Sequence, residues 1–215
     1  MMSSILLVED HAVVRNGLKQ MLIENLDLVV LAEANDAIEA MQQVRKQDWD
    51  LVVLDIRLPG RSGVDVLKQI KSEKPHLPVL ILSSYPESQY AVRLIQAGAA
   101  GYISKDAEET EIIKAVKTAA AGGRYINEIV GGLLANTMSR SFSNADDLSL
   151  YESLSDREYQ IFLELASGKR AKDIAEKLQV SAKTVATHRS RLMQKMGFST
   201  NAELILYANK SGLLL

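Results

Sequence analysis

The sequence contains no cysteine among its 215 residues. Disulfide frameworks, zinc sites built from thiolates and cysteine nucleophiles are therefore excluded. Long hydrophobic runs are also absent, because the apolar stretch from Ile5 to Val8 lacks a basic flank and is cut by Glu9 and Asp10. We accordingly expect neither a signal peptide nor a membrane span, and a cytoplasmic location follows by default. Internal repeats and low-complexity tracts are missing as well, so we expect a globular chain.

Charge is unevenly distributed along the chain. Residues 1–154 carry 15 Lys and Arg against 21 Asp and Glu, whereas residues 155–215 carry 10 against 6. The formal net charge of −2 therefore hides an acidic front and a basic tail. A basic tail favours a nucleic-acid partner, although chance surface composition would produce the same asymmetry.

The front of the chain alternates short apolar runs with longer segments of helical period. The runs lack polar alternation, which is typical of strands buried on both faces, and they cover residues 4–9, 28–34, 51–55, 78–83 and 101–104. Helices are predicted between them near 12–24, 36–47, 63–73, 87–97 and 108–121. This order predicts an α/β fold, a flavodoxin-like doubly wound sheet of five parallel strands.

The remainder of the chain is predicted to be helical. An amphipathic segment over 127–138 leads into a polar stretch, 139–153, which has the composition of a linker. Four further helices are predicted over 156–166, 171–178, 182–196 and 200–210. We therefore expect one domain over 1–124, a helix and polar linker over 125–153, and an all-α domain over 154–215.

Acidic residues follow two of the predicted strands. Glu9 and Asp10 come after the first strand and Asp55 after the third. In an open parallel sheet ligands bind beyond the carboxyl ends of the strands, so these carboxylates are expected to converge. Oxygen ligands of this kind suit Mg²⁺, and a cation would let an anionic phosphoryl donor approach an anionic aspartate.

Two more strand ends complete the expected group. Ser83 closes the fourth strand and Lys105 follows the fifth. A phosphoryl group on Asp55 would need a hydroxyl, an ammonium and a metal ion to neutralise its oxygens. An aspartate at a strand end is by itself more often a helix cap, and a single lysine is usually solvated. Their joint placement is what favours a phosphoacceptor site.

Apolar spacing in the tail indicates two helices packed around a short turn. The spacing is carried by Ile174, Ala175, Leu178, Val180, Val185, Leu192 and Met196. Ser181 is well placed to cap the second helix, and the opposite face of that helix is polar. Such a face either reads DNA in the major groove or is simply solvated, and periodicity alone does not decide between the two.

Specific motifs decide more than periodicity does. Four segments resemble the signatures of two-component receiver domains: Leu6 to His11, Leu54 to Pro59 with Gly63, Leu82-Ser83, and Gly98 to Lys105. A second set is similar to the LuxR-type helix-turn-helix: Leu154 to Glu158, Ala166 to Lys169, Asp173 to Ala175, Leu178, Ser181, Thr184-Val185, His188, Lys195-Met196 and Gly212-Leu213. The chain thus resembles the NarL/FixJ family of response regulators over nearly its whole length.

The resemblance implies roles for individual residues of the front domain. It implies that a sensor histidine kinase phosphorylates Asp55, with Mg²⁺ bound by Glu9, Asp10, Asp55 and the backbone carbonyl of Arg57. It further implies that Lys105 contacts the phosphate. Ser83 would move toward the phosphate, and Tyr102 would change its burial in response.

For the tail, the resemblance implies a scaffold helix over 171–178, a recognition helix over 182–196 and a dimerisation helix over 200–210. A homodimer formed on phosphorylation would then bind double-stranded promoter DNA. The expected DNA-contacting residues are Ser181, Lys183, Thr184, Thr187, His188, Arg189, Ser190, Arg191, Gln194 and Lys195. Many relatives have Lys where Ala186 stands, and some also where Ser190 stands. We hypothesise that Arg189 and Arg191 supply the charge instead, which would change the DNA target.

Alternative interpretations remain at this stage. A phosphohydrolase could use Asp55 as a nucleophile, but such enzymes need an acidic residue two positions later, where Arg57 stands. The front domain could also serve for dimerisation or docking without phosphorylation. His11 is interpreted as a loop or helix-start residue, so we predict no catalytic residue and no enzyme activity. Arg57 either tunes the lifetime of the phosphate or is solvated.

Overall fold

The computed structural model describes residues 3–26, 29–59, 61–143 and 150–214. The chain divides into two compact units, Met1–Gly131 and Gly132–Leu215. This division falls inside the segment 125–153 that we expected to join two domains. Among the described residues, no helix combines the length and the apolar character that a membrane crossing needs.

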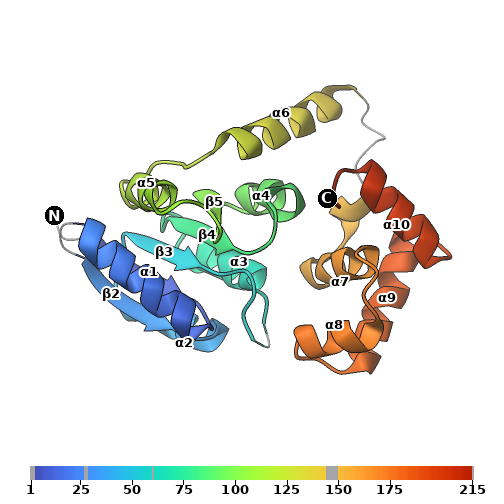
Figure 1. The fold of residues 1–215 in the computed structure, drawn as a ribbon, viewed down its shortest axis with the longest axis horizontal. Helices are drawn as coiled ribbons and strands as arrows, with labels where there is room; N and C mark the ends of the chain where they lie inside the picture. The colour runs from blue at the N-terminus through green and yellow to red at the C-terminus, as the bar shows by residue number, and fades with distance from the viewer. Residues whose placement is uncertain (1–2, 27–28, 60, 144–149, 215) are drawn as a thin grey trace. The chain divides into compact units, whose positions relative to one another are not determined.

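The first unit is built on a parallel sheet. Its strands are β1 (Ser3–Val8), β2 (Val29–Ala34), β3 (Leu51–Leu54), β4 (Val79–Ser83) and β5 (Gly101–Ser104), in the order β2-β1-β3-β4-β5 (Figure 1). The predicted doubly wound fold is thus confirmed. In the register, Val8 pairs with Leu54 and Ser83 pairs with Ser104. The residues that follow these strands therefore emerge at one edge of the sheet.

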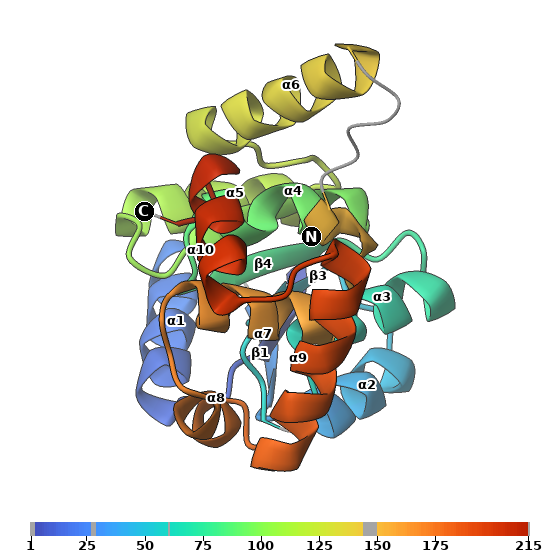
Figure 2. The same ribbon diagram turned by 90° about the vertical axis from the view of Figure 1, so that its right-hand side faces the viewer.

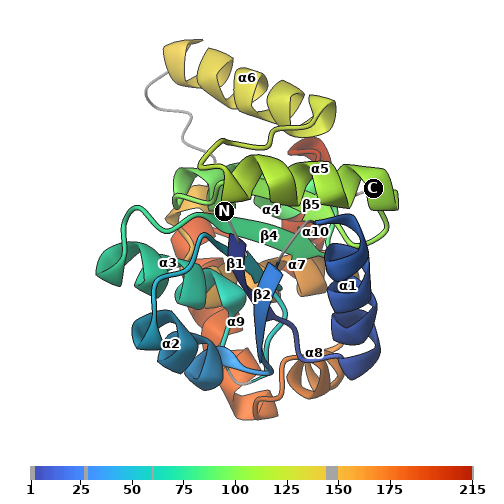
Figure 3. The same ribbon diagram turned by 90° about the vertical axis from the view of Figure 1, so that its left-hand side faces the viewer.

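Helices cover both faces of this sheet. They are α1 (Ala12–Asn25), α2 (Ala37–Lys46), α3 (Gly63–Glu73), α4 (Glu87–Gln96) and α5 (Glu109–Ala120). α1 lies to one side of the strands, and α2 and α3 lie to the other (Figure 3). Leu22 of α1 and Val116 of α5 pack with Ile5, Val53 and Leu80 in one buried core. Strands buried on both faces explain the absence of polar alternation in the sequence.

The predicted start of α2 is one residue too early, because it includes the residue that caps the helix. Asp36 caps α2, because its side chain accepts hydrogen bonds from the backbone N–H groups of Ile38 at 2.7 Å and Glu39 at 2.8 Å. The helix therefore begins at Ala37 and not at Asp36. The predicted start of the second strand, Leu28, lies outside the described residues.

The helix that follows the first unit is longer than the sequence predicts. α6 (Glu128–Ser143) continues five residues beyond the predicted end at 138. The polar stretch expected from residue 139 onward is thus helical through Ser143, and a short 3-10 turn, η1 (Leu150–Ser153), lies near its other end. The part of the expected linker between them, residues 144–149, lies outside the described residues.

After η1, the second unit has four helices at the predicted places. They are α7 (Asp156–Ala166), α8 (Ala171–Lys177), α9 (Ala182–Met196) and α10 (Asn201–Lys210) (Figure 2). Ser155 and Glu158 form a capping box at α7, and Thr200 and Glu203 form another at α10. Val185 and Leu192 of α9 and Leu204 of α10 are fully buried. The predicted all-α fold is confirmed.

One glycine fixes the path of the chain behind Asp55. A Cβ atom on Gly63 would lie 2.2 Å from the Asp55 carbonyl oxygen and 2.7 Å from the Ile56 Cα. The backbone amide of Gly63 also donates to the Ile56 carbonyl at 2.8 Å. The start of α3 can therefore approach the end of β3 only because residue 63 lacks a side chain.

We predict that Gly63→Ala destabilises the first unit by roughly 2 to 3 kcal/mol, because backbone atoms must move to admit the methyl group. Urea unfolding followed by the fluorescence of Trp49 measures this unit, since the chain has a single tryptophan. Gly17→Ala is the control, because a Cβ there meets nothing within 4 Å. Equal midpoints for the two variants would contradict the prediction.

Candidate functional site

The candidate site lies where the strands of the first unit end. Glu9 and Asp10 follow β1, Asp55 follows β3 and Lys105 follows β5. The backbone of Asp55 is fixed by the sheet, because its N–H donates to the Val8 carbonyl at 3.0 Å. The expected convergence of strand-end residues is therefore seen for Glu9, Asp10, Asp55 and Lys105.

Lys105 holds two carboxylates together. Its Nζ donates to Asp55 Oδ2 at 2.7 Å and also to Glu9 Oε2. The carboxylates of Glu9 and Asp55 are buried, and the Lys105 side chain is only 11% exposed. In such a setting an ammonium and a carboxylate interact far more strongly than at the surface. Lys105 is thus already within reach of any group attached to Asp55.

Burial disfavours the ionised form of the Asp55 carboxylate. Loss of solvent raises its pKa above the ordinary value for aspartate, and the neighbouring Glu9 raises it further. The Lys105 ammonium acts in the opposite direction, as does the backbone N–H of Arg57, which donates to Asp55 Oδ1 at 3.1 Å. Additional positive charge at the site would therefore stabilise the ionised form of Asp55.

The donor set fits a hard divalent cation. Ligand atoms of Glu9, Asp10, His11 and Asp55 all lie within 4.8 Å of one another. Asp10 Oδ1 is buried and has no hydrogen bond within the described part of the chain, although His11 Nδ1 lies 2.8 Å away. Three carboxylates face a single buried ammonium. Oxygen-rich, negatively charged sites of this kind suit Mg²⁺.

His11 lies at the rim of this cluster. It occupies the N-cap position of α1, and its backbone N–H donates to Glu9 Oε1 at 3.0 Å. Its Nε2 is 3.5 Å from the Arg57 guanidinium. The sequence interpretation placed His11 at a helix start but missed that its ring faces the carboxylates. The position of His11 directly after Glu9 and Asp10 was the signal in the sequence for this contact.

Sequence reasoning also missed a supporting residue on α1. The guanidinium of Arg15 donates to the Glu9 carbonyl at 2.7 Å and to Glu33 at 3.0 Å. Lys19 binds the other oxygen of Glu33 at 2.6 Å, and this hydrogen bond is the main cause of the lowered pKa of Glu33. The four-residue spacing of Arg15 and Lys19 places both on one face of the helix. Arg15 thereby fixes the backbone of Glu9.

Ser83 and Tyr102 form a separate network beside the carboxylates. The Ser83 hydroxyl accepts a hydrogen bond from the Tyr85 N–H at 3.1 Å, and the Tyr102 hydroxyl donates to the Tyr85 carbonyl at 2.6 Å. Burial raises the pKa of Tyr102, and a hydrogen bond with Ser83 partly offsets this rise. Both side chains are fully buried. This conformation therefore ties Ser83 to the loop before α4.

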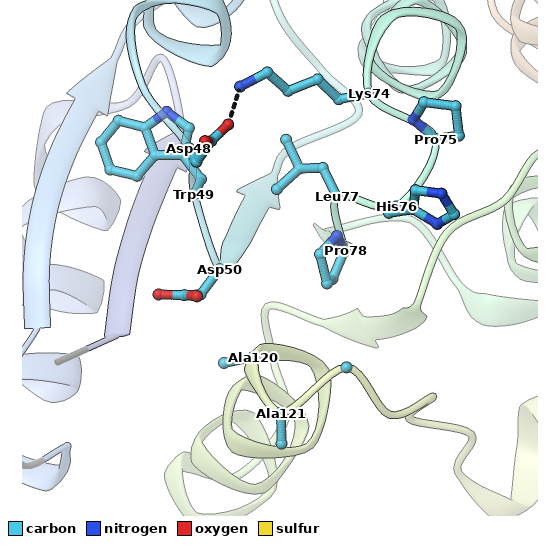
Figure 4. A pocket seen from close by; sticks show the side chains of 11 residues that line it. Asp48, Trp49, Asp50, Lys74, Pro75, His76, Leu77, Pro78, Ala120 and Ala121 are labelled. Carbon is cyan, nitrogen blue, oxygen red and sulfur yellow. Dashed lines mark hydrogen bonds and ion pairs between the residues drawn. The ribbon is translucent and has the colours of Figure 1, made fainter. Parts of the chain in front are cut away.

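A pocket of about 570 Å³ lies elsewhere in the same unit. Its lining comes from Asp48 to Asp50, Lys74 to Pro78 and Ala120 to Gly122, at the amino ends of β3 and β4 (Figure 4). Lys74 is bonded there to Asp48, and Asp50 is bonded to the amide of Ser4. Ligands of open α/β sheets bind at the opposite, carboxyl ends of the strands. We therefore assign the site to the Asp55 edge.

The second unit presents a polar stripe on α9. The stripe consists of exposed residues at helical spacing: Lys183, Thr187, Ser190, Arg191 and Gln194. Arg191 makes no hydrogen bond or ion pair with the described residues. Ala186, also exposed, adds no polar group. Lys183 and Arg191 are thus the cations of this stripe.

Four of the other residues expected to contact DNA have partners within the unit: Ser181, Thr184, Arg189 and Lys195. Arg189 donates to Asn201 Oδ1 at 2.8 Å, and Lys195 donates to Glu158 at 2.6 Å. Ser181 caps α9 by accepting from the Thr184 N–H at 3.0 Å, and its hydroxyl also bonds that of Thr184.

His188 is only partly exposed. Its Nδ1 is buried and finds no hydrogen-bond partner in the described ranges. Burial lowers the pKa of His188, and nearby Arg157 lowers it further. The expected set of contacts is thus divided into a solvent-facing stripe, four residues bonded within the unit, and the partly buried His188.

Comparison with known families gives two matches. The model of the response regulator receiver domain matches residues 5–117, and that of the bacterial regulatory proteins of the luxR family matches residues 152–208. The first match contains the whole carboxylate cluster, and the second contains α7 to α9 and most of α10.

Individual relatives match over nearly the full chain. The response regulator GacA of Pseudomonas aeruginosa is 33% identical over 213 residues, covering 99% of this chain and 98% of GacA. The oxygen regulatory protein NreC of Staphylococcus carnosus is 36% identical over 216 residues, covering 98% of each chain. The structure of RcsB from Salmonella enterica serovar Typhimurium, bound to the promoter rprA with BeF3−, has a TM-score of 0.63. It is 23% identical and covers 96% of this chain and 98% of its own, so it shares the fold.

We predict that Asp55→Asn stabilises the first unit at pH 7 in the presence of EDTA. The raised pKa means that the folded protein holds this proton more tightly than the unfolded chain. Stability is therefore lost as pH rises through the window between the ordinary and the raised pKa of Asp55. The difference between variant and wild type should vanish at acid pH and reach its full value above the window.

Urea unfolding followed by Trp49 fluorescence at several pH values checks this. Asp106→Asn is the control, because Asp106 is exposed. A less stable Asp55→Asn protein at pH 7, or a difference that does not change with pH, would contradict the raised pKa of Asp55 in the folded protein.

Proposed function

The chain belongs to the NarL/FixJ family of two-component response regulators, with a receiver domain followed by a LuxR-type DNA-binding domain, and we propose that phosphorylation of Asp55 controls its binding to promoter DNA. The observation that carries the proposal is the bond between Lys105 Nζ and Asp55 Oδ2, 2.7 Å long, inside a cluster of buried carboxylates. The donor of the phosphoryl group is a sensor histidine kinase.

Asp55 is the nucleophile in the proposed reaction. One of its carboxylate oxygens attacks the phosphorus of a phosphohistidine on the kinase. An O–P bond forms as the P–N bond breaks, and the imidazole nitrogen keeps the electron pair. Lys105 supports this step because its ammonium opposes the rise in the pKa of Asp55 that burial causes, and then lies beside the new phosphoryl oxygens.

Glu9, Asp10, Asp55 and the backbone carbonyl of Arg57 would hold Mg²⁺. The bound ion supplies charge neutralisation between the anionic donor and the anionic Asp55. The buried Asp10 Oδ1, which accepts no hydrogen bond from the described residues, and the excess of carboxylates over cations support this ligand set. Arg15 contributes indirectly by holding the backbone of Glu9.

Ser83 and Tyr102 would report the new charge to the rest of the domain. A phosphoryl group on Asp55 would draw the Ser83 hydroxyl away from the amide of Tyr85. That change removes one bond from the network that also holds the Tyr102 hydroxyl. Phosphorylation would therefore shift the population of conformations around β4, α4 and β5.

In the DNA-binding domain, α9 would enter the major groove with α8 as its scaffold. The exposed stripe on α9 supports this, because its side chains are long enough to reach phosphates and base edges. α10 would form the contact of a homodimer, which its exposed Leu206 supports. Two half-sites about one DNA turn apart would then be read by one dimer.

Phosphate-affinity electrophoresis tests the receiver half of the proposal. After incubation with acetyl phosphate and MgCl₂, the wild-type protein should give a retarded band that Asp55→Asn lacks. Asp10→Asn should need a higher Mg²⁺ concentration for the same yield, because it removes one charged ligand.

Asp106→Asn serves as the matched control, since it removes a nearby but exposed carboxylate. A retarded band in Asp55→Asn, or none in the wild type, would refute phosphorylation of Asp55. The second result would favour a receiver that acts only in dimerisation or docking.

The structure changes the prediction for the two arginines of α9. Arg191→Ala should weaken binding to a duplex selected by the wild-type protein by about 10- to 100-fold, the usual value of a bidentate contact to guanine. If Arg191 contacts a phosphate instead, the slope of the logarithm of affinity against the logarithm of salt concentration should fall in magnitude by about 1. Arg189→Ala should have a much smaller effect, because Arg189 is bonded to Asn201.

Fluorescence anisotropy across a range of salt concentrations measures both effects. Asn201→Ala is the matched variant for Arg189→Ala, because each breaks the same link between α9 and α10. If Arg189→Ala weakened binding strongly while Asn201→Ala did not, Arg189 would contact DNA directly and the assignment would be wrong.

A further inference from the structure

α6 contains two adjacent glycines at the boundary between the units. Gly131 is the last residue of the first unit and Gly132 is the first residue of the second. Both lie inside the helix, which Figure 1 shows as one continuous coil. A glycine inside a helix costs about 1 kcal/mol relative to alanine, because the chain loses more conformational freedom there. The presence of two adjacent glycines inside this helix therefore needs an explanation.

Close packing does not supply that reason. A Cβ atom on Gly132 would meet nothing within 4 Å, and one on Gly131 would meet only Ile126 Cγ2 at an ordinary 3.7 Å. Backbone conformation does not supply it either. Gly98, Gly122, Gly168, Gly197 and Gly212 have positive φ angles, whereas Gly131 and Gly132 do not. Alanine would fit at both positions in this conformation.

The residues before the pair are firmly attached to the receiver domain. The N–H of Tyr125 donates to the Ala100 carbonyl at 2.8 Å, beside β5. Asn127 caps the first turn of α6 by accepting from the Val130 N–H at 2.9 Å, and Val130 is fully buried. The chain is therefore fixed up to the residue that precedes Gly131.

The residues after the pair receive little support. Met138 is 62% exposed, and Leu133 and Leu134 are only partly buried. The Thr137 hydroxyl bonds back to the Leu133 carbonyl at 2.9 Å, an arrangement that weakens and bends helices. Beyond it the helix ends in the sequence Ser-Arg-Ser-Phe-Ser, which is poor in strong helix formers. None of residues 132–138 is buried, and a short helical segment with so little buried surface is marginal in water.

We propose that Gly131 and Gly132 are a built-in breaking point of α6, at which the helix exchanges with coil and frees the DNA-binding unit from the receiver domain. The anchored first turn forms the fixed side of this hinge, and the weakly supported helix forms the other side. The hinge lets the units reorient without unfolding either one. The hinge depends on the glycine pair and not on the phosphorylation of Asp55. The following test therefore stays valid if the phosphorylation proposal fails.

The test replaces both glycines by alanine and follows amide hydrogen exchange in the full-length protein. In the wild type, the amides of residues 132–137 should exchange much faster than those of α5, which is packed on the sheet. In Gly131→Ala/Gly132→Ala they should exchange about 30-fold more slowly, since two substitutions each remove the helix cost of a glycine. Gly17→Ala is the matched control, because Gly17 is also an exposed helical glycine with open space for a Cβ.

A second measurement reports the freedom of the units themselves. Because the chain has no cysteine, Gln42→Cys on α2 and Ala202→Cys on α10 give a clean pair of sites for single-molecule energy transfer. Both residues are exposed. The distribution of transfer efficiency should be broad in the wild type and in Gly17→Ala, and narrower in the double alanine variant.

Two results would overturn the proposal. One is exchange at residues 132–137 as slow as that of α5 in the wild type, since the helix would then not open. The other is slower exchange in the double alanine variant without any narrowing of the transfer-efficiency distribution, because the units would then move about some other point.

Discussion

The structure of the receiver domain depends on one ammonium group shared by two buried carboxylates. Lys105 Nζ bonds both Glu9 and Asp55, and these three residues follow strands that are far apart in sequence. The parallel sheet, with the order β2-β1-β3-β4-β5, brings them to one edge. Because the carboxylates outnumber the cation, the edge is left with an excess of negative charge, and the buried Asp10 Oδ1 has only the His11 ring beside it among the described residues. Under the proposed function, this imbalance would let the site bind a divalent cation and, through it, a phosphoryl group.

Control of DNA binding then becomes a question of how a local change in charge is transmitted. In the present conformation the hydroxyls of Ser83 and Tyr102 hold the loop before α4. Under the proposed function, a phosphoryl group on Asp55 would compete for Ser83 and so bias that loop. The polar stripe on α9 is already formed in this conformation, with Arg189 and Lys195 bonded within the unit. Phosphorylation would therefore act on access to this stripe or on dimerisation, and the proposed hinge at the glycine pair of α6 would give the units the freedom to reorient.

The sequence predicted the fold well because its signals are strong and local. Uninterrupted apolar runs mark strands buried on both faces, and α3, α7 and α9 have the predicted ends. The convergence of Glu9, Asp55 and Lys105 followed from the rule that parallel strands end at one edge. Side-chain direction could not be predicted in this way. Arg189 and Arg191 are two positions apart and chemically identical, yet the start of α10 brings Asn201 beside only one of them. The length of α6 was also missed, because the helix continues through residues with low helix propensity.

The central claim is that Asp55, and no other carboxylate of the cluster, receives the phosphoryl group. Borohydride reduction tests it most directly, because it converts an aspartyl phosphate to homoserine and leaves free aspartate unchanged. The full-length protein would be treated with acetyl phosphate and Mg²⁺, reduced, digested and mapped by mass spectrometry. The account predicts homoserine at position 55 alone, and none without Mg²⁺. Homoserine at position 10 or at any other aspartate, or unmodified Asp55 in every peptide, would contradict it.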